Sequence, residues 1–373
     1  MEARGNPRPA GGLGGRTAID YERRMLSREF QLLVDACRSA IAGEPLPTGA
    51  IEAVHWAEFV SLARRHRVQA LAWDSLRRAG TAVPAQQADQ LAGDAARTAE
   101  QNLRSVAESA RLRGAFEKSG VPVLFIKGLT LAAVAYPRPF LKMSRDIDIL
   151  VPAGSVAEAG AVLRSGGYRL VEPEATASLT SWHSRRKESV WHKPDANLYL
   201  DLHTRLSDNP RLIPGIGLNS PMRLVEVAPK VALPTLIGDE LFAYLCVHGA
   251  SSAWFRLKWV TDIAALLRAA EAAEVERLYN RALLLGAGRA PAQALILANS
   301  LYGIALEPRL RDELLGDSRN RWLIGAALRL LAAGEPTARP FGTALIHLTQ
   351  LLLLPGVRFK AGEIRRQLVE VLS

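Results

Sequence analysis

One stretch, residues 121–151, limits the possible folds more than any other part of the chain. It opens with an apolar run, Val121 to Ile126, that is too short for a helix and contains three β-branched residues, which predicts a buried strand. Lys127-Gly128 ends that strand, and Leu129–Tyr136 is predicted to form a short helix that stops at the prolines after it. A second strand is predicted at Arg145–Val151. The segment therefore predicts a strand, a helix and a strand in close succession.

The second of these strands carries two acids on one face. Side chains alternate along a strand, so Asp146 and Asp148 share one face while Ile147 and Ile149 occupy the other. We expect the Cα atoms of the two acids roughly 6.6 Å apart, a spacing that suits carboxylates jointly holding metal ions. Because strands disfavour aspartate, the pair predicts a functional site.

A further acidic strand is predicted about fifty residues later. Glu188–His192 and Leu198–His203 are predicted to form a hairpin around a Pro-Asp-Ala-Asn turn. Asp201, on the return strand, would complete a three-carboxylate metal site with Asp146 and Asp148. Oxygen ligands of this kind select Mg²⁺ or Mn²⁺ rather than zinc.

These motifs resemble those of a known family. The chain is similar to the uncharacterised nucleotidyltransferase family, related to the polymerase-beta-like superfamily, in Lys127-Gly128, Arg145-Asp146-x-Asp148, Asp201-x-His203, His248-Gly249 and Trp259-x-x-Asp262. The similarity runs from about residue 30 to at least residue 270. It implies an α+β fold whose nucleotidyltransferase core is a small mixed sheet with helices. It also implies that Asp146, Asp148 and Asp201 are metal ligands and that an NTP is the donor.

The turn after the first strand departs from the superfamily pattern. Most members have Gly-Gly or Gly-Ser there, where a hydroxyl and backbone N–H groups hold the triphosphate. Here the turn reads Lys-Gly-Leu-Thr at residues 127–130, so we expect either Lys127 or Thr130 to take over that role. The resemblance implies a nucleotide site made of Lys127, Gly128, Thr130, Arg145, His203 and His248, with Lys127 and Arg145 offsetting charge on the phosphates.

Helical patterns surround this core on both sides. The sequence predicts four regions: a disordered arm at 1–20, a helical N-terminal region at 21–114, a nucleotidyltransferase catalytic domain at 115–235 and a helical C-terminal domain at 236–373. In the C-terminal domain we expect helices at 237–248, 254–267, 272–286, 289–302, 319–333 and 341–354, followed by a basic amphipathic tail.

Two basic runs leave alternatives open. Residues 172–187 are expected to be irregular and end in Arg185-Arg186-Lys187, which either meets the triphosphate or an anionic acceptor, or is a charged loop. The Arg64–Arg67 run either contacts phosphates or is a solvated helix end. The whole chain has ten more Lys and Arg than Asp and Glu. This excess favours anionic partners, but a merely solvated basic surface explains it about as well.

Several classes of protein are excluded by composition. Cys37 and Cys246 are the only cysteines, too few for a disulfide framework or a cysteine-rich metal site. The first residues lack the apolar core of a signal peptide, and no apolar run is long enough to span a membrane. We therefore expect a cytoplasmic protein without a membrane partner.

The expected activity is metal-dependent transfer of an NMP group from an NTP to an acceptor, with release of pyrophosphate. Asp146 and Asp148 would hold the ion that grips the triphosphate, and with Asp201 they would hold a second ion that acidifies the acceptor. RNA, a peptide hydroxyl and a small molecule are all compatible acceptors. Two alternatives stay open: glycosyl transfer from a nucleotide-sugar at the same acidic site, and a catalytically inactive nucleotide-binding module.

Overall fold

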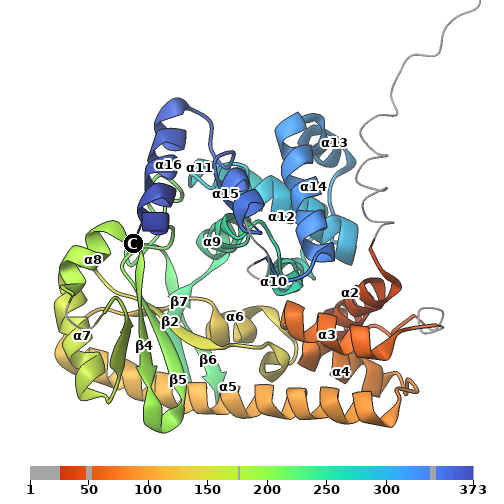
Figure 1. Ribbon diagram of the computed structural model, residues 1–373, viewed down its shortest axis with the longest axis horizontal. Helices are drawn as coiled ribbons and strands as arrows, with labels where there is room; N and C mark the ends of the chain where they lie inside the picture. Colours follow the sequence, from red (N-terminus) through yellow and green to blue (C-terminus); the bar gives the residue numbers. More distant parts are fainter. Residues whose placement is uncertain (1–25, 48–52, 175–176, 337–341, 373) are drawn as a thin grey trace, which may run out of the picture.

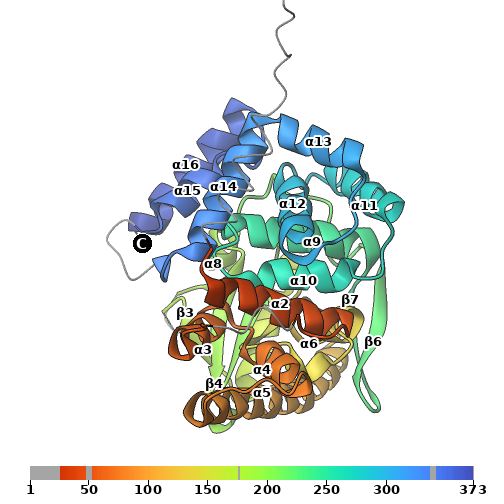
Figure 2. The same ribbon diagram turned by 90° about the vertical axis from the view of Figure 1, so that its right-hand side faces the viewer.

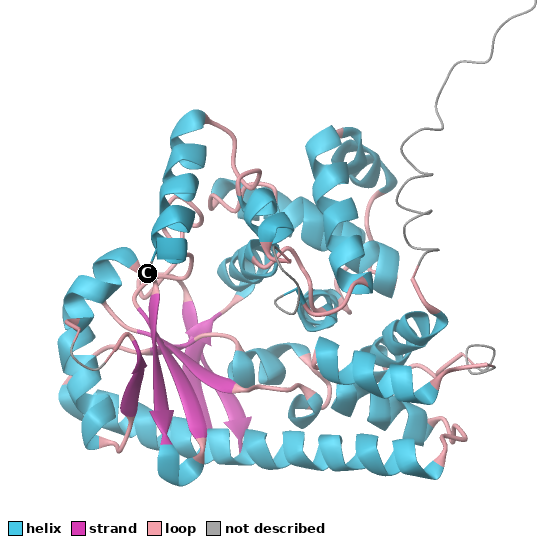
Figure 3. Ribbon diagram, in the orientation of Figure 1, coloured by secondary structure: helices cyan, strands magenta, loops and turns pink. Residues whose placement is uncertain are grey.

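The computed structural model of the protein describes residues 26–47, 53–174, 177–336 and 342–372 (Figure 1). The predicted disordered arm at 1–20 lies outside these residues. A small mixed sheet is flanked by helices from both ends of the chain, which confirms the predicted α+β fold (Figure 3). None of the described helices has the length and apolar composition needed to cross a membrane.

The central sheet has five strands in the order β1-β2-β5-β4-β3. Strands β2 and β5 are parallel, and every other neighbouring pair in this sheet is antiparallel. The bounds are β1 Leu124–Phe125, β2 Asp146–Leu150, β3 Arg169–Glu172, β4 Glu188–Lys193 and β5 Leu198–His203. The first strand is therefore shorter than predicted, because only two of the six apolar residues pair with β2.

One face of the sheet is apolar and packs against helices. Ile147 and Ile149 of β2 join Leu200 and Leu202 of β5 in a buried cluster, as strand alternation requires. The same cluster contains side chains of α5 (Ala85–Ser119), α7 (Val156–Ser165) and α8 (Leu179–Arg185). Since this face is filled, the acids that alternate with the apolar residues face the other way.

Two structured segments differ from the sequence prediction. Helix α8 lies within residues 172–187, which were expected to be irregular; the Ser178 hydroxyl accepts a hydrogen bond from the N–H of Ser181 and caps it. Strands β6 (Met222–Ala228) and β7 (Val231–Leu236) form a two-stranded sheet that was not predicted. Pro234 argues against a central strand, but each strand of a two-stranded sheet is an edge, where proline is tolerated.

The helices on either side of the sheet share one hydrophobic core. The N-terminal helices are α2 (Arg28–Ala42), α3 (Trp56–His66) and α4 (Gln69–Arg78). Helix α2 lies beside α10 and contacts it (Figure 2). The helices after the sheet are α9 (Gly238–Ser251), α10 (Leu257–Leu267), α11 (Ala272–Leu284), α12 (Ala290–Tyr302), α13 (Pro308–Gly316), α14 (Ser318–Ala332), α15 (Ala344–Gln350) and α16 (Val357–Leu372).

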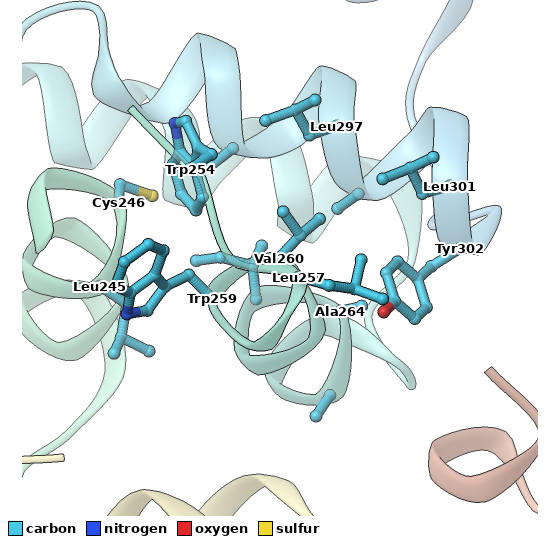
Figure 4. Packing of buried hydrophobic residues seen from close by; sticks show 14 of the residues in the cluster. Leu245, Cys246, Trp254, Leu257, Trp259, Val260, Ala264, Leu297, Leu301 and Tyr302 are labelled. Atoms are coloured by element: carbon cyan, nitrogen blue, oxygen red, sulfur yellow. The ribbon is translucent and has the colours of Figure 1, made fainter. Parts of the chain in front are cut away.

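Helix α10 begins three residues later than predicted. Ala253 and Trp254 both have positive φ, 46° and 56°, which a right-handed helix does not allow. The backbone therefore turns before α10 and buries the Trp254 ring completely. Side chains of α10, including Val260, then pack against α12 at Leu297 and Leu301 (Figure 4). Helix α6 (Gly128–Ala135) contacts α10, so this packing also sets the position of the turn that precedes α6.

Candidate active site

The parallel pairing of β2 with β5 places two carboxylates next to each other. Asp148 lies in register with Asp201, and His203 lies two residues further along β5 on the same face. Asp148, Asp201 and His203 each offer a ligand atom, and these atoms lie within 4.8 Å of one another. Asp146 is not part of this trio. It is half-buried at the start of β2, where its charge acts on Asp201 and Lys127.

Asp148 is the buried centre of the trio. Its Oδ1 atom lies 2.7 Å from the Lys127 ammonium and accepts a hydrogen bond from Nε2 of His203 at 3.1 Å. Burial raises the pKa of Asp148, but the Lys127 charge and the His203 hydrogen bond outweigh it and lower this pKa below its ordinary value. Asp148 is therefore a carboxylate, stabilised by two neighbours.

Asp201 has the opposite electrostatic environment. Burial, and then the charges of Asp148 and Asp146, raise the pKa of Asp201 to about 8. Two carboxylates side by side on neighbouring strands repel each other unless a proton or a cation lies between them. A divalent cation would relieve this repulsion and keep both groups ionised.

The donor atoms present fit a divalent cation. Nδ1 of His203 is buried and has no hydrogen-bond partner among the described residues, while Oε2 of Glu188 lies 3.2 Å from it. Glu188 is in register with His203 across the β4–β5 pair, and its charge also acts on Asp201. The residues that would hold the ion are Asp148, Asp201 and His203, with Glu188 beside them. Carboxylates suit Mg²⁺ and Mn²⁺, and an imidazole in the set favours Mn²⁺ of these two.

Lys127 occupies the turn between β1 and α6 in an unusual backbone conformation. Its φ is 58° and its ψ is −151°, a region that residues with a Cβ rarely adopt, and Gly128 follows with φ 56°. The ammonium is mostly buried. Burial lowers the pKa of Lys127, but Asp148 and other acidic neighbours raise it well above its ordinary value. A charged ammonium is thus held at the amino end of α6, beside the carboxylates.

The other predicted nucleotide-site residues differ in accessibility. Thr130 is buried, and its hydroxyl donates to the carbonyl oxygens of Phe125 and Lys127, at 3.2 and 2.9 Å. Arg145 is exposed at the start of β2. His248 is half-buried between the rings of Tyr244 and Trp259. Its pKa lies well below the ordinary value because of burial and of the charges of three lysines.

A group of cations from distant parts of the chain extends the site. Lys142 lies 3.7 Å from Asp262, which also accepts a hydrogen bond from the Tyr136 hydroxyl at 2.7 Å. Burial, Lys142 and Arg67 lower the pKa of Lys258 to about 7. The pKa of Arg67 is lowered to about 10, mainly by burial and to a smaller extent by the charges of Arg256 and Arg145. Neighbouring cations add to the effect of burial in both pKa shifts, so positive charge is concentrated here, a pattern that favours an anionic ligand.

Several of these residues, Glu188 and Lys258 among them, are not among the site residues predicted from the sequence. Glu188 could have been found, because the predicted hairpin already pairs it with His203. Arg67, at the end of α3, belongs to the Arg64–Arg67 run, for which phosphate contact is one of the two predictions. Lys258 on α10 reaches the site only through tertiary packing, and nothing in its local sequence marks it. The Arg64–Arg67 run is not simply a solvated helix end, since His66 is completely buried.

The sequence is similar to a known protein family. A family model described as uncharacterised nucleotidyltransferase matches residues 52–303. That range contains the trio on β2 and β5, the Lys127 turn and the cations around Lys258. It ends before α13 and α16. No curated protein matches the chain.

Proposed function

The chain belongs to the uncharacterised nucleotidyltransferase family, and from this premise we propose that it transfers an NMP group from an NTP to an acceptor and releases pyrophosphate. The observation that carries the proposal is the position of Asp148, Asp201 and His203 on adjacent parallel strands, next to the Lys127 ammonium. Buried carboxylates, an imidazole and an ammonium at one point match a reaction in which negative charge is moved between phosphates.

One group of residues would act on the donor triphosphate, and another on the acceptor oxygen. Lys127 and the cations around Lys258 would bind the triphosphate and stabilise the negative charge that builds on the leaving pyrophosphate. Asp148, Asp201 and His203 would hold a divalent cation, which when bound polarises the phosphate and acidifies the acceptor oxygen. The acceptor oxygen would attack the α-phosphorus, the bond from that phosphorus to the bridging oxygen would break, and Asp201 would take the acceptor's proton.

One observation favours a second candidate function. The Lys127 ammonium already lies 2.7 Å from Asp148, where it neutralises a carboxylate that a metal would otherwise bind. A chain that retains this ion pair would bind a nucleotide without turning it over. The two functions differ in a simple way, because only the transferase releases pyrophosphate.

The test is a screen for pyrophosphate release with the four common NTPs, Mg²⁺ or Mn²⁺, and pools of RNA, peptides and small metabolites. We expect release that depends on both the metal and one pool, and that is lost in Asp148→Asn. Asp195→Asn serves as the matched control, because Asp195 is exposed on the turn between β4 and β5. Binding of NTP without release in any pool would favour the inactive module.

A further inference from the structure

A hollow of about 430 Å³ lies between the end of α8, the loop after β5 and helix α16. Its most unusual feature is the concentration of guanidinium groups around it. Six arginines line it and only one carboxylate, Asp208, does so; the arginines are Arg185, Arg186, Arg205, Arg211, Arg365 and Arg366. Two of these arginines belong to α16, which lies outside the range matched by the family model.

Internal ion pairs account for only part of this charge: Arg366 pairs with Glu363 at 2.5 Å on its own helix. Asp208 lies 3.4 Å from the Lys187 ammonium, so its charge is shared with a lysine outside the hollow. Arg205 donates to the carbonyl oxygens of His183 and Arg185, at 3.0 and 2.7 Å, so the backbone rather than an acid orients it. Three further arginines are exposed, and among the described residues no carboxylate lies within ion-pair distance of them: Arg185, Arg211 and Arg365.

The hollow leads towards the candidate active site. A neighbouring cavity of about 250 Å³ shares three of its lining residues, Arg186, Asp208 and Arg366. The same cavity reaches Lys187 and Glu188, and Oε2 of Glu188 lies 3.2 Å from Nδ1 of His203. The arginines are thus connected to the metal-ligand trio through Glu188. The hollow lies on the side of α8, the loop after β5 and α16, whereas Arg67 and Lys258 come from the side of α3 and α10 (Figure 1).

We propose that the arginine-lined hollow binds a phosphate-bearing acceptor, an inference that rests on the proposed nucleotidyl transfer. The volume is within the usual range for small-molecule sites. Guanidinium groups present paired N–H donors that match phosphate oxygens, and the three exposed arginines without a carboxylate partner among the described residues are available for such contacts. The donor triphosphate is already provided with cations on the α10 side, so a second basic site on the α8 side serves the other substrate.

The phosphate has two possible sources, a phosphorylated small molecule or the 5′-phosphate of a nucleic acid. Two probes separate them: ribose 5-phosphate, and a short single-stranded oligonucleotide carrying a 5′-phosphate. Their binding to the full chain is measured by calorimetry with the donor site filled by a non-hydrolysable NTP analogue and Mn²⁺. Binding of both probes would show that a small phosphate ester is sufficient for binding in the hollow. Binding of the oligonucleotide alone would show that the ligand is a nucleic acid.

The variant that tests the site is Arg211→Gln with Arg365→Gln, two exposed side chains whose loss leaves the core intact. The matched control is Arg169→Gln with Arg309→Gln, which removes the same charge from exposed positions outside the hollow. We expect the first pair to weaken probe binding on the order of tenfold or more and the control pair to change it by less than about twofold. Equal losses in both pairs, or no binding of either probe to the parent chain, would overturn the proposal.

The outcome is separable from that of the proposed function. Pyrophosphate release that is unaffected by the Arg211 and Arg365 changes, at limiting acceptor, contradicts the acceptor site and leaves nucleotidyl transfer in place. Arginine-dependent probe binding without pyrophosphate release in any acceptor pool supports the phosphate site and contradicts the transferase.

Discussion

At the scale of single residues, Lys127 carries two energetic costs, backbone strain and burial of its charge, that a lysine with a purely structural role would avoid. Its backbone adopts a conformation that costs of the order of 1–3 kcal/mol, and its ammonium is largely removed from water. Strain of this kind persists where the surroundings hold it, and it is concentrated at functional sites. The ion pair with Asp148 offsets the burial, and the ammonium lies at the amino end of α6, where we propose that the triphosphate binds.

Replacing Lys127 should therefore affect nucleotide binding more than replacing Thr130. Lys127→Gln removes one charge-assisted contact worth about 1.5–3 kcal/mol, so NTP affinity should fall on the order of ten- to a hundredfold. Thr130→Val should lower the free energy of unfolding instead, because that hydroxyl bonds backbone carbonyls inside the fold. Calorimetry with NTP and urea unfolding on both variants distinguish these results. Small, equal effects on NTP affinity would mean that the backbone alone holds the phosphates.

The pKa of Lys258 predicts how the free energy of unfolding changes with pH. Its pKa is about 7 in the folded chain against an ordinary value of 10.5, so the unfolded chain binds more protons between these values. The charged form of Lys258 destabilises the fold; this cost is fully present below pH 7 and vanishes as pH rises past about 10.5. Lys258→Met should therefore stabilise the protein at pH 6.5, with a gain that shrinks by about pH 10, in urea unfolding curves. A variant that is less stable than the parent at pH 6.5 would contradict this.

At the scale of elements, the sequence predicts the parts with short-range signals and misses those that depend on packing. Strands β2 and β5 and helix α6 are recognisable because apolar alternation and prolines mark them locally. Helix α8 was missed because its seven residues are mostly polar and give no clear apolar periodicity. Strand β7 was missed because Pro234 falls inside it, and β6 pairs only with β7. The trio on β2 and β5 depends on a parallel pairing between segments about fifty residues apart, which no local pattern specifies.

Alanine substitution should have opposite effects on stability at two glycines, one of which lies at the close contact between α9 and the turn before α10. A Cβ on Gly249 would overlap the buried Trp254 ring, so Gly249→Ala should destabilise the fold by about 1–3 kcal/mol. Gly114 lies inside α5 with open space where a Cβ would be, so Gly114→Ala should stabilise it by about 0.5–1 kcal/mol. Urea unfolding of both variants measures the pair. Stabilisation by both changes would show that the Trp254 packing is looser than described.

At the scale of the whole molecule, the helices before and after the sheet form one unit. Phe30 and Phe59 belong to the same buried cluster as Phe242, Leu301 and Leu328. The predicted division into regions 21–114, 115–235 and 236–373 stays a prediction. The cluster shows that N-terminal and C-terminal helices bury a common apolar surface, which holds α3 and α10 together near β2 and β5.

Arg65 is one of the polar links across this shared core. Its guanidinium donates to the carbonyls of Leu330 and Leu331 at the end of α14, at 2.7 and 2.8 Å, where a cation is favoured. Arg65→Met should lower the free energy of unfolding by about 1.5–3 kcal/mol. Arg64→Met is the control: its ion pair with Asp94 is partly exposed and should contribute at most about 1 kcal/mol. Similar losses in the two variants would mean that Arg65 does not join the two sets of helices.

In the proposed function, Asp148, Asp201 and His203 hold a divalent cation that engages the NTP. The most direct measurement is calorimetric binding of a non-hydrolysable NTP analogue with Mn²⁺ and with EDTA, in the parent chain and in Asp201→Asn. We predict that Mn²⁺ tightens binding to the parent chain on the order of a hundredfold. We also predict that Asp201→Asn abolishes this gain while its stability without metal is unchanged or higher, since one repelling carboxylate is gone. Equal affinity in Mn²⁺ and EDTA for the parent chain would contradict the claim.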